Sequence, residues 1–93
     1  MVIFILERVP PSLRGELSRW LIQPKVGVFV GHLSGRVRDL LWRRIQQSLR
    51  KGAALLIYSD KNEQGFTLHS MGDPRRLVVD FGGLLLPKTP NSV

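Results

Sequence analysis

Val2-Ile3-Phe4-Ile5-Leu6 is an unbroken apolar run, and the acidic residue Glu7 closes it. A strand that is apolar at every position is expected in the centre of a sheet, where both of its faces are covered. A second copy of the chain could cover one of those faces. The run therefore predicts a central strand with a carboxylate, that of Glu7, at its end.

Helical and extended patterns alternate after this strand. Pro10 and Pro11 predict the start of a helix, because proline fits the first helical turn, and Pro24 predicts its end. One face of that helix carries Leu13, Leu17, Trp20 and Leu21. The later predicted elements are a strand over Val26–Val30 that bends at Gly31 and continues to Leu33, a helix from the N-cap Ser34 to Gly52, strands over Ala53–Tyr58, Phe66–Met71 and Leu77–Phe81, and a last apolar piece, Leu84-Leu85-Leu86.

This order of elements predicts an α+β fold. A ferredoxin-like sandwich fits it, with two helices on one face of an antiparallel sheet and an added C-terminal hairpin or tail. The other sheet face must meet something, and a homodimer is the simplest solution. The predicted division is a ferredoxin-like domain over residues 1–81 and a C-terminal strand or tail for partner docking over residues 82–93.

The composition favours nucleic acid as a partner. The chain has 14 Lys and Arg residues against 7 Asp and Glu residues, a formal net charge of +7, and most of the cations are arginines. A guanidinium group binds phosphate oxygens in a bidentate way, which an ammonium group cannot do. No long basic amphipathic segment supports a membrane partner. The N-terminal apolar run is too short for a signal peptide or a membrane span, so a cytoplasmic protein is expected.

Several other site classes are disfavoured. With no cysteine, the chain has no disulfide and no thiolate metal site. Trp20 and Trp42 lie in or beside apolar helical stripes, so we interpret both as core or interface residues rather than base-stacking ones. The cations of the second helix are interpreted as a solvated face; they include Arg43, Arg44, Arg50 and Lys51.

A set of short motifs resembles a known family. The motifs, in chain order, are Glu7, Val9-Pro10-Pro11-x-Leu13-Arg14-Gly15, Trp20-Leu21, Gly27-Val28-x-Val30-Gly31, Trp42, Gly65-Phe66 and Arg75-Arg76. Together they resemble the CRISPR-associated protein two of type I-E systems, from Met1 to about Phe81. The resemblance implies a ferredoxin-like homodimer that acts as a scaffold in spacer acquisition. Such a dimer joins two dimers of the CRISPR integrase and holds the double-stranded DNA that becomes a new spacer.

The resemblance also implies roles for individual residues. Four arginines match positions that hold the DNA backbone: Arg14, Arg36, Arg75 and Arg76. Glu63 matches a position near the integrase contact, and the tail that docks on the integrase includes Leu84, Leu85 and Leu86. The scaffold role requires no cofactor.

Glu7 leaves a second function open. Elsewhere in this family an aspartate ends the first strand, and its two copies meet across the dimer axis, where they could hold Mg²⁺. The alternative is therefore a metal-dependent endonuclease acting on RNA or DNA, with paired Glu7 as catalytic residue and metal ligand. Glutamate is one methylene longer than aspartate and Arg8 follows it, so the scaffold is the preferred interpretation and Glu7 is then a strand-end carboxylate paired with an arginine.

Overall fold

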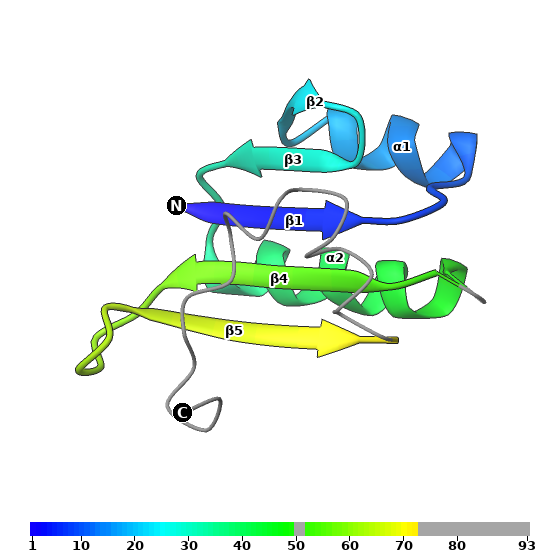
Figure 1. Ribbon diagram of the computed structural model, residues 1–93. Helices are drawn as coiled ribbons and strands as arrows, with labels where there is room; N and C mark the ends of the chain where they lie inside the picture. Colours follow the sequence, from blue (N-terminus) through cyan, green and yellow to red (C-terminus); the bar gives the residue numbers. More distant parts are fainter. Residues whose placement is uncertain (50–51, 73–93) are drawn as a thin grey trace.

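The computed structural model describes residues 1–49 and 52–72 as a single antiparallel sheet with two helices packed on it (Figure 1). The elements are β1 (Val2–Leu6), α1 (Pro11–Ser18), β2 (Ile22–Lys25), β3 (Val28–Gly31), α2 (Gly35–Ser48), β4 (Ala54–Ser59) and β5 (Phe66–Met71). The five strands follow the order β2-β3-β1-β4-β5. This α+β architecture is compatible with the predicted ferredoxin-like fold.

Strand β1 is the central strand, as its composition predicts. It pairs with β3 on one side and with β4 on the other, so that Phe4 lies opposite both Phe29 and Leu56. Successive side chains of a strand point to opposite faces of the sheet. Val2, Phe4 and Leu6 accordingly belong to the core beneath the helices, whereas Ile3 and Ile5 belong to a second apolar cluster.

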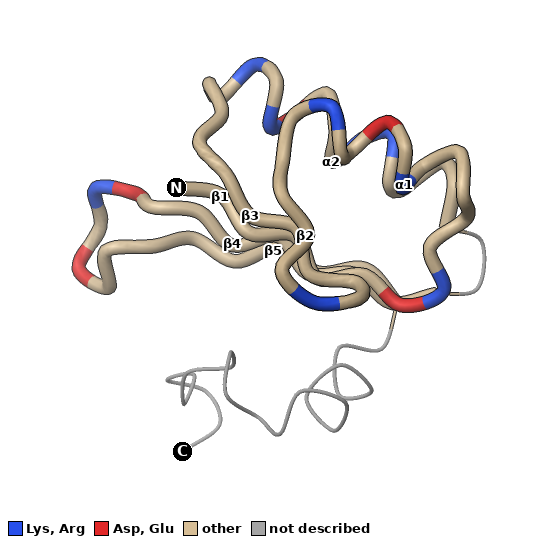
Figure 2. Tube along the Cα trace, turned by 90° about the horizontal axis from the view of Figure 1, so that it is seen from above, with Lys and Arg blue, Asp and Glu red and all other residues tan. Residues whose placement is uncertain are grey.

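Both helices cover the same face of the sheet (Figure 2). Helix α1 contributes Leu13 and Leu17 to the core, and α2 contributes Leu41 and Ile45. The ring of Trp42 stacks on that of Phe4, with 6.4 Å between the ring centroids. Trp42 is therefore a packing residue, in agreement with the interpretation from sequence.

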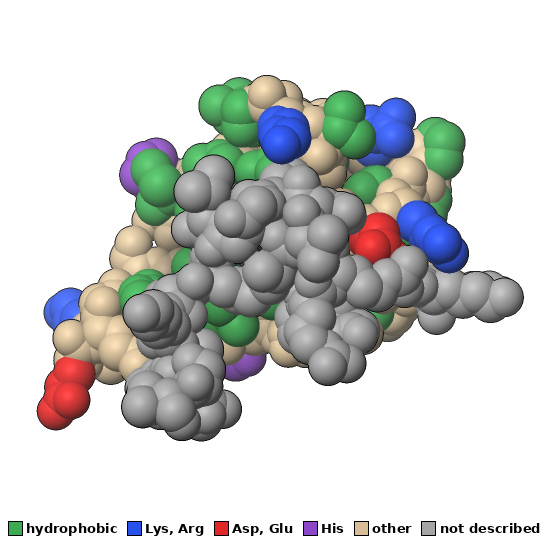
Figure 3. Space-filling model, in the orientation of Figure 1, with side chains coloured by type: hydrophobic (Ala, Val, Ile, Leu, Met, Phe, Trp, Pro, Cys, Tyr) green, Lys and Arg blue, Asp and Glu red, His purple; other side chains and the backbone are tan. Residues whose placement is uncertain are grey.

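The other face of the sheet is apolar as well. Ile5, Ala53 and Leu55 form its buried cluster, and partly buried apolar side chains from β1, β4 and β5 surround them: Ile3, Ile57 and Leu68. Figure 3 views the molecule from this face. A sheet with two apolar faces explains why no polar residue interrupts β1.

The prediction for the chain between Ser18 and Val30 was wrong. Helix α1 ends at Ser18, and residues 22–25 form the edge strand β2, which pairs with β3. Gly27 lies in the turn between these strands with φ 83°, whereas the sequence pattern placed it inside a strand. Its carbonyl accepts a hydrogen bond of 2.7 Å from the Leu6 N–H. The residues that were predicted to end the helix therefore form the first strand of the β2–β3 hairpin.

Most of the later elements agree with prediction. The Ser34 hydroxyl accepts a hydrogen bond from the Val37 N–H and caps α2. Strand β5 has the predicted bounds, and β4 differs from its prediction by one residue at each end. The predicted continuation of the second strand to Leu33 is wrong, because β3 ends at Gly31.

Some predicted elements lie outside the described residues. They are the strand Leu77–Phe81, the apolar piece Leu84–Leu86 and the boundary between residues 81 and 82. Among the described residues, no helix is long and apolar enough to cross a membrane.

The close approach of β1 to the β2–β3 turn predicts a large cost for a side chain at Gly27. A Cβ atom there would lie 2.5 Å from the Leu6 carbonyl oxygen, whereas at Gly65, which has the same φ of 83°, it would meet nothing within 4 Å. Gly65→Ala is expected to lower the free energy of unfolding by about 1 kcal/mol, the cost of the left-handed backbone alone. Gly27→Ala adds a steric clash and is expected to cost roughly 3 kcal/mol.

Urea unfolding of the two variants, followed by circular dichroism, checks this prediction. Equal losses of stability in both variants would contradict it, because they would show that contact with Leu6 adds nothing.

Candidate functional site

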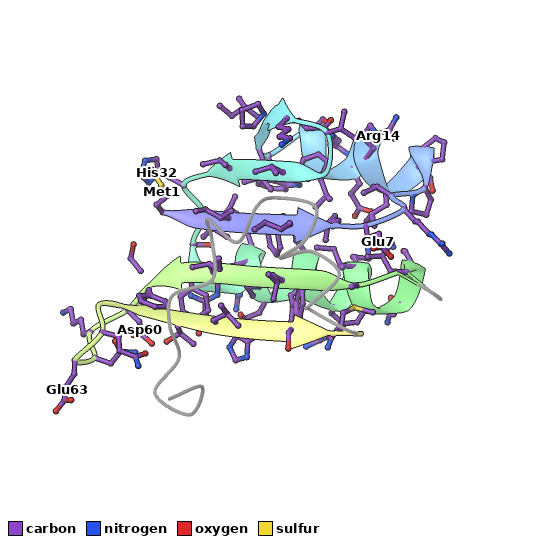
Figure 4. The ribbon with its side chains drawn as sticks, viewed as in Figure 1. Met1, Glu7, Arg14, His32, Asp60 and Glu63 are labelled. Atoms are coloured by element: carbon purple, nitrogen blue, oxygen red, sulfur yellow. The ribbon has the colours of Figure 1, made fainter. Side chains whose placement is uncertain are left out.

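Glu7 stands directly after β1, at the end of the sheet from which α1 departs (Figure 4). Leu6 points into the core, so alternation along the strand directs Glu7 toward the face opposite the helices. The Glu7 N–H donates a hydrogen bond of 2.9 Å to the Ala53 carbonyl, which joins β1 to the chain that enters β4. A Cβ atom at Gly52 would collide with the Glu7 carbonyl oxygen, so glycine permits this close approach.

The residue after Glu7 changes the direction of the chain. Arg8 has φ 60°, which is the left-handed region and is uncommon for a residue other than glycine. Its side chain is exposed, whereas one carboxylate oxygen of Glu7, Oε1, is shielded from solvent. The Glu7 carboxylate is thus partly shielded from solvent, whereas the neighbouring Arg8 is exposed.

In the nuclease alternative, Glu7 would hold Mg²⁺ together with its copy in a second protomer. Mg²⁺ in proteins is held by carboxylates together with waters and substrate phosphates. Within residues 1–49 and 52–72, no group of three or more His, Cys, Asp or Glu side chains is placed to hold a metal ion. The described part of one protomer therefore does not assemble such a cluster around Glu7.

Helices α1 and α2 together form one layer of the molecule, called the helical layer below. Arg14 and Arg36 are both exposed on it. Helix α1 follows β1 and α2 follows β3; because these strands are antiparallel, the two helices begin at opposite ends of the sheet. Arg14 lies in the first turns of α1 (Figure 4) and Arg36 in the first turn of α2. The structure does not bring the two predicted DNA contacts together at one point.

A salt bridge between the two helices indicates how Arg14 and Arg36 are placed relative to each other. Glu16 of α1 pairs with Arg44 of α2 at 3.2 Å, which sets α1 against the C-terminal half of α2. Arg36 precedes Arg44 by about two helical turns, or roughly 12 Å along the axis. Arg14 and Arg36 would therefore contact different phosphates of one nucleic acid backbone.

Arg14 and Arg36 differ from Arg38 and Arg44 of the same two helices, because they form neither of the salt bridges found among the described residues. The salt bridges among the described residues are Arg44–Glu16 and Arg38–Asp39, the latter at 3.0 Å. The Arg38 guanidinium also lies 3.7 Å from the centroid of the Tyr58 ring. Arg38 and Arg44 are thus engaged within the fold, whereas Arg14 and Arg36 remain available to an external anion.

An aromatic stack beside α2 was not predicted from sequence. The Tyr58 ring stacks on His69 at 5.9 Å between centroids, and its hydroxyl lies 3.4 Å from His69 Nε2. Arg38 covers the same tyrosine. The three residues meet only through the β4–β5 register and the position of α2, and no spacing in the sequence signals that meeting.

Glu63 projects from the turn between β4 and β5, at the end of the sheet opposite Glu7 (Figure 4). Side chains on both sides of it hold the turn. Asn62 accepts a hydrogen bond of 2.8 Å from the Gly65 N–H and donates one of 2.9 Å to the Phe66 carbonyl. Glu63 is therefore an exposed carboxylate on an ordered turn, a geometry suited to contact with a cationic partner.

Asp60 ties the same turn to β5. The hydrogen bond from the Thr67 hydroxyl lowers the pKa of Asp60 below its ordinary value of 3.8. The hydrogen bond from the Lys61 N–H lowers this pKa further. Burial raises the pKa by a smaller amount, and the positive charge of Arg38, which lowers it, has the smallest effect.

The remaining predicted site residues lie outside the described residues. They are Arg75, Arg76, Leu84, Leu85 and Leu86. Arg50 and Lys51, for which the sequence pattern predicts a solvated helix face, lie outside them as well.

Comparison with known families gives a match over nearly the whole chain. A family model described as "CRISPR-associated protein (Cas_Cas2CT1978)" matches residues 1–86. The matched range includes Glu7, Arg14, Arg36 and Glu63.

The Asp60–Thr67 hydrogen bond leads to a prediction about pH. Thr67→Val keeps the shape of the side chain but removes the donor, so the pKa of Asp60 is expected to rise toward 3.8, whereas Thr67→Ser should preserve the lowered pKa. Because the pKa is lowered in the folded state, the stabilisation is present at neutral pH and is lost as the pH falls below about 3.8. NMR titration of the Asp60 carboxyl carbon measures the effect. An unchanged pKa in Thr67→Val would assign the shift to Lys61 and Arg38 instead.

Proposed function

The chain belongs to the CRISPR-associated Cas2 family, and on that premise we propose that it is a non-catalytic, DNA-binding scaffold in CRISPR adaptation. In this proposal a cytoplasmic homodimer bridges two dimers of the CRISPR integrase and holds the DNA duplex that becomes a new spacer. The family match over residues 1–86 is the observation that carries the proposal.

The charges of the helical layer support binding to a phosphate backbone. Arg14 and Arg36 are exposed, form neither of the salt bridges found in the described part of the chain, and are spaced to meet separate phosphates. Contacts of this kind position a duplex without reading its sequence. A scaffold that accepts DNA of many sequences needs this property.

The second apolar face of the sheet supports the homodimer. Ile3, Ile57 and Leu68 surround the buried cluster on that face and are themselves only partly buried. Pairing two such faces would bury this apolar surface further, and a twofold axis would present Arg14 and Arg36 twice. Doubling the contacts lengthens the stretch of duplex that the protein can hold.

The geometry at Glu7 is compatible with a scaffold role. The Glu7 backbone joins β1 to the entry of β4, and the described residues of one protomer do not gather a metal-binding cluster around the side chain. A structural role for this strand-end glutamate would account for its backbone hydrogen bond to Ala53 without a catalytic function. An endonuclease would need the partner's copy of this residue and Mg²⁺.

Glu63 is the proposed point of contact with the integrase. It is exposed on a turn held by hydrogen bonds of Asn62, so little conformational entropy would be lost when a cationic partner binds. Leu84, Leu85 and Leu86 are proposed to dock on the same partner.

Salt-dependent binding of duplex DNA tests the arginines. Each phosphate contact contributes about −0.9 to the slope of log K against log salt, and each substitution in a homodimer removes two such contacts. Arg14→Ala and Arg36→Ala are each expected to reduce the magnitude of the slope by roughly 2. Lys61→Ala is the matched control, because it removes one charge from the β4–β5 turn rather than from the helical layer. If the slope changed equally in all three variants, the loss of binding would come from the lower net charge of the protein and not from specific contacts of Arg14 and Arg36.

Cleavage assays with Glu7→Ala separate the scaffold from the nuclease. The assay uses labelled duplex DNA and single-stranded RNA with Mg²⁺, and compares the wild type with the variant. We expect both proteins to bind duplex and neither to cut. Cleavage by the wild type that disappears in Glu7→Ala would overturn the scaffold proposal and make Glu7 a metal ligand.

A further inference from the structure

An apolar groove lies at the corner of the molecule where α1 ends and the edge strand β2 begins. It has a volume of about 480 Å³, and its walls include Met1, Trp20, Ile22 and Val30 together with the polar side chains of Arg19 and His32. Figure 4 shows Met1 and His32 side by side at the start of β1. The groove is remote from Glu7, which stands at the opposite end of that strand.

The early end of α1 creates this groove. The Trp20 and Leu21 N–H groups both donate to the Leu17 carbonyl, at 3.0 and 2.9 Å, and close the last turn. Leu21 then enters the core, whereas Trp20 remains 49% exposed. A Cβ atom at Gly31 would lie 2.8 Å from the Leu21 side chain, so glycine permits the close approach of these two residues in the lining of the groove.

Several large apolar side chains around the groove are exposed to solvent instead of buried in the core. Ile22 is 70% exposed and Met1 is 57% exposed, in addition to Trp20. Single exposed apolar residues are ordinary, but a contiguous apolar patch beside a cavity marks an interaction surface. Tryptophan is also among the residues that contribute most to protein interfaces.

The charge around the groove indicates the chemistry of its partner. Arg19 is exposed and takes part in neither of the salt bridges found within the described ranges. Among the residues that the structure describes, no Asp or Glu side chain lines the groove. A ligand that matches this surface has a large apolar side chain for the groove and a carboxylate next to it for the guanidinium group.

The edge strand restricts how such a ligand can lie. An open sheet edge normally invites a peptide to add a strand. Pro24 has no N–H group, however, and the pairing of β2 is irregular between Ile22 and Lys25. Docking therefore depends on side chains placed in the groove rather than on a continuous ladder along β2.

We propose that this groove, formed by Trp20, Ile22 and Met1 beside Arg19, is a docking site for a short acidic and hydrophobic peptide segment of a partner protein. The bound segment inserts one large apolar side chain against Trp20 and places a carboxylate on Arg19. This site is separate from the DNA contacts of Arg14 and Arg36 and does not depend on them.

A displayed library of random twelve-residue peptides, selected on the wild-type protein, identifies the preferred ligand class. Sequences that bind Ile22→Ser equally well are discarded. We expect the enriched peptides to combine a large apolar residue with Asp or Glu. The proposal would be overturned if the enriched peptides were basic. It would also be overturned if no enriched peptide bound the wild type better than Ile22→Ser.

Fluorescence then locates the binding. The chain has two tryptophans, so Trp42→Phe leaves Trp20 as the single reporter, and its emission should shift to the blue when a selected peptide covers it. Arg19→Glu is expected to weaken binding at least 10-fold and to favour a peptide whose acidic residues are replaced by lysine. Val26→Ser is the matched control, because Val26 is 81% exposed and lies outside the groove.

Two other occupants have distinct outcomes. If single-stranded DNA shifts the emission of Trp20 and the selected peptides do not, the groove holds a nucleotide base and the proposal fails. If Ile22→Ser changes the oligomeric state in sedimentation analysis while Val26→Ser does not, a second copy of the chain occupies the groove, and the proposal fails in that case as well.

Discussion

The pairing of β1 on both of its edges is the constraint on which the rest of the structure depends. Every residue of this strand faces either the helical core or the second apolar cluster, and hydrogen bonds to β3 and β4 use both edges. Neither apolar face tolerates a polar side chain without a partner, because burying it would cost free energy. The first charged residue, Glu7, can therefore appear only where the strand ends.

The predictable parts of the fold are those in which local pattern and tertiary packing agree. The apolar run of β1, the Ser34 cap of α2 and the alternation of β5 each indicate the element that forms. The chain after Ser18 is different, because Leu17 and Leu21 keep helical spacing although the helix ends between them. Leu21 is buried either way, so its position could not distinguish a longer helix from a turn. Gly27 was the sequence signal for a turn at this place, because its left-handed backbone lies in the turn between β2 and β3.

The candidate site shows the same division between local and tertiary information. Helical spacing places Arg36 outside the apolar stripe of its helix, whereas Arg14 was selected through the family resemblance, and both are exposed. Their spacing was not predicted from sequence, since it depends on the antiparallel start of the two helices and on the pairing of Glu16 with Arg44. The stack of Arg38, Tyr58 and His69 requires three elements to meet in a particular register, for which the sequence contains no local mark. Trp20 was interpreted as a core or interface residue, and its 49% exposure excludes the core.

The sheet also separates the surfaces that the proposed scaffold would present to different partners. Helices α1 and α2 carry the exposed Arg14 and Arg36, the β4–β5 turn carries Glu63, and the groove at the β2 edge carries Trp20. The central strand connects these regions rigidly, because displacement of β1 would break pairing on both sides at once. Partners bound at such distant places can therefore be held in a constant geometry without touching one another. A small domain achieves this by using both faces of one sheet for stability and leaving its ends, edges and helical surface free for contacts.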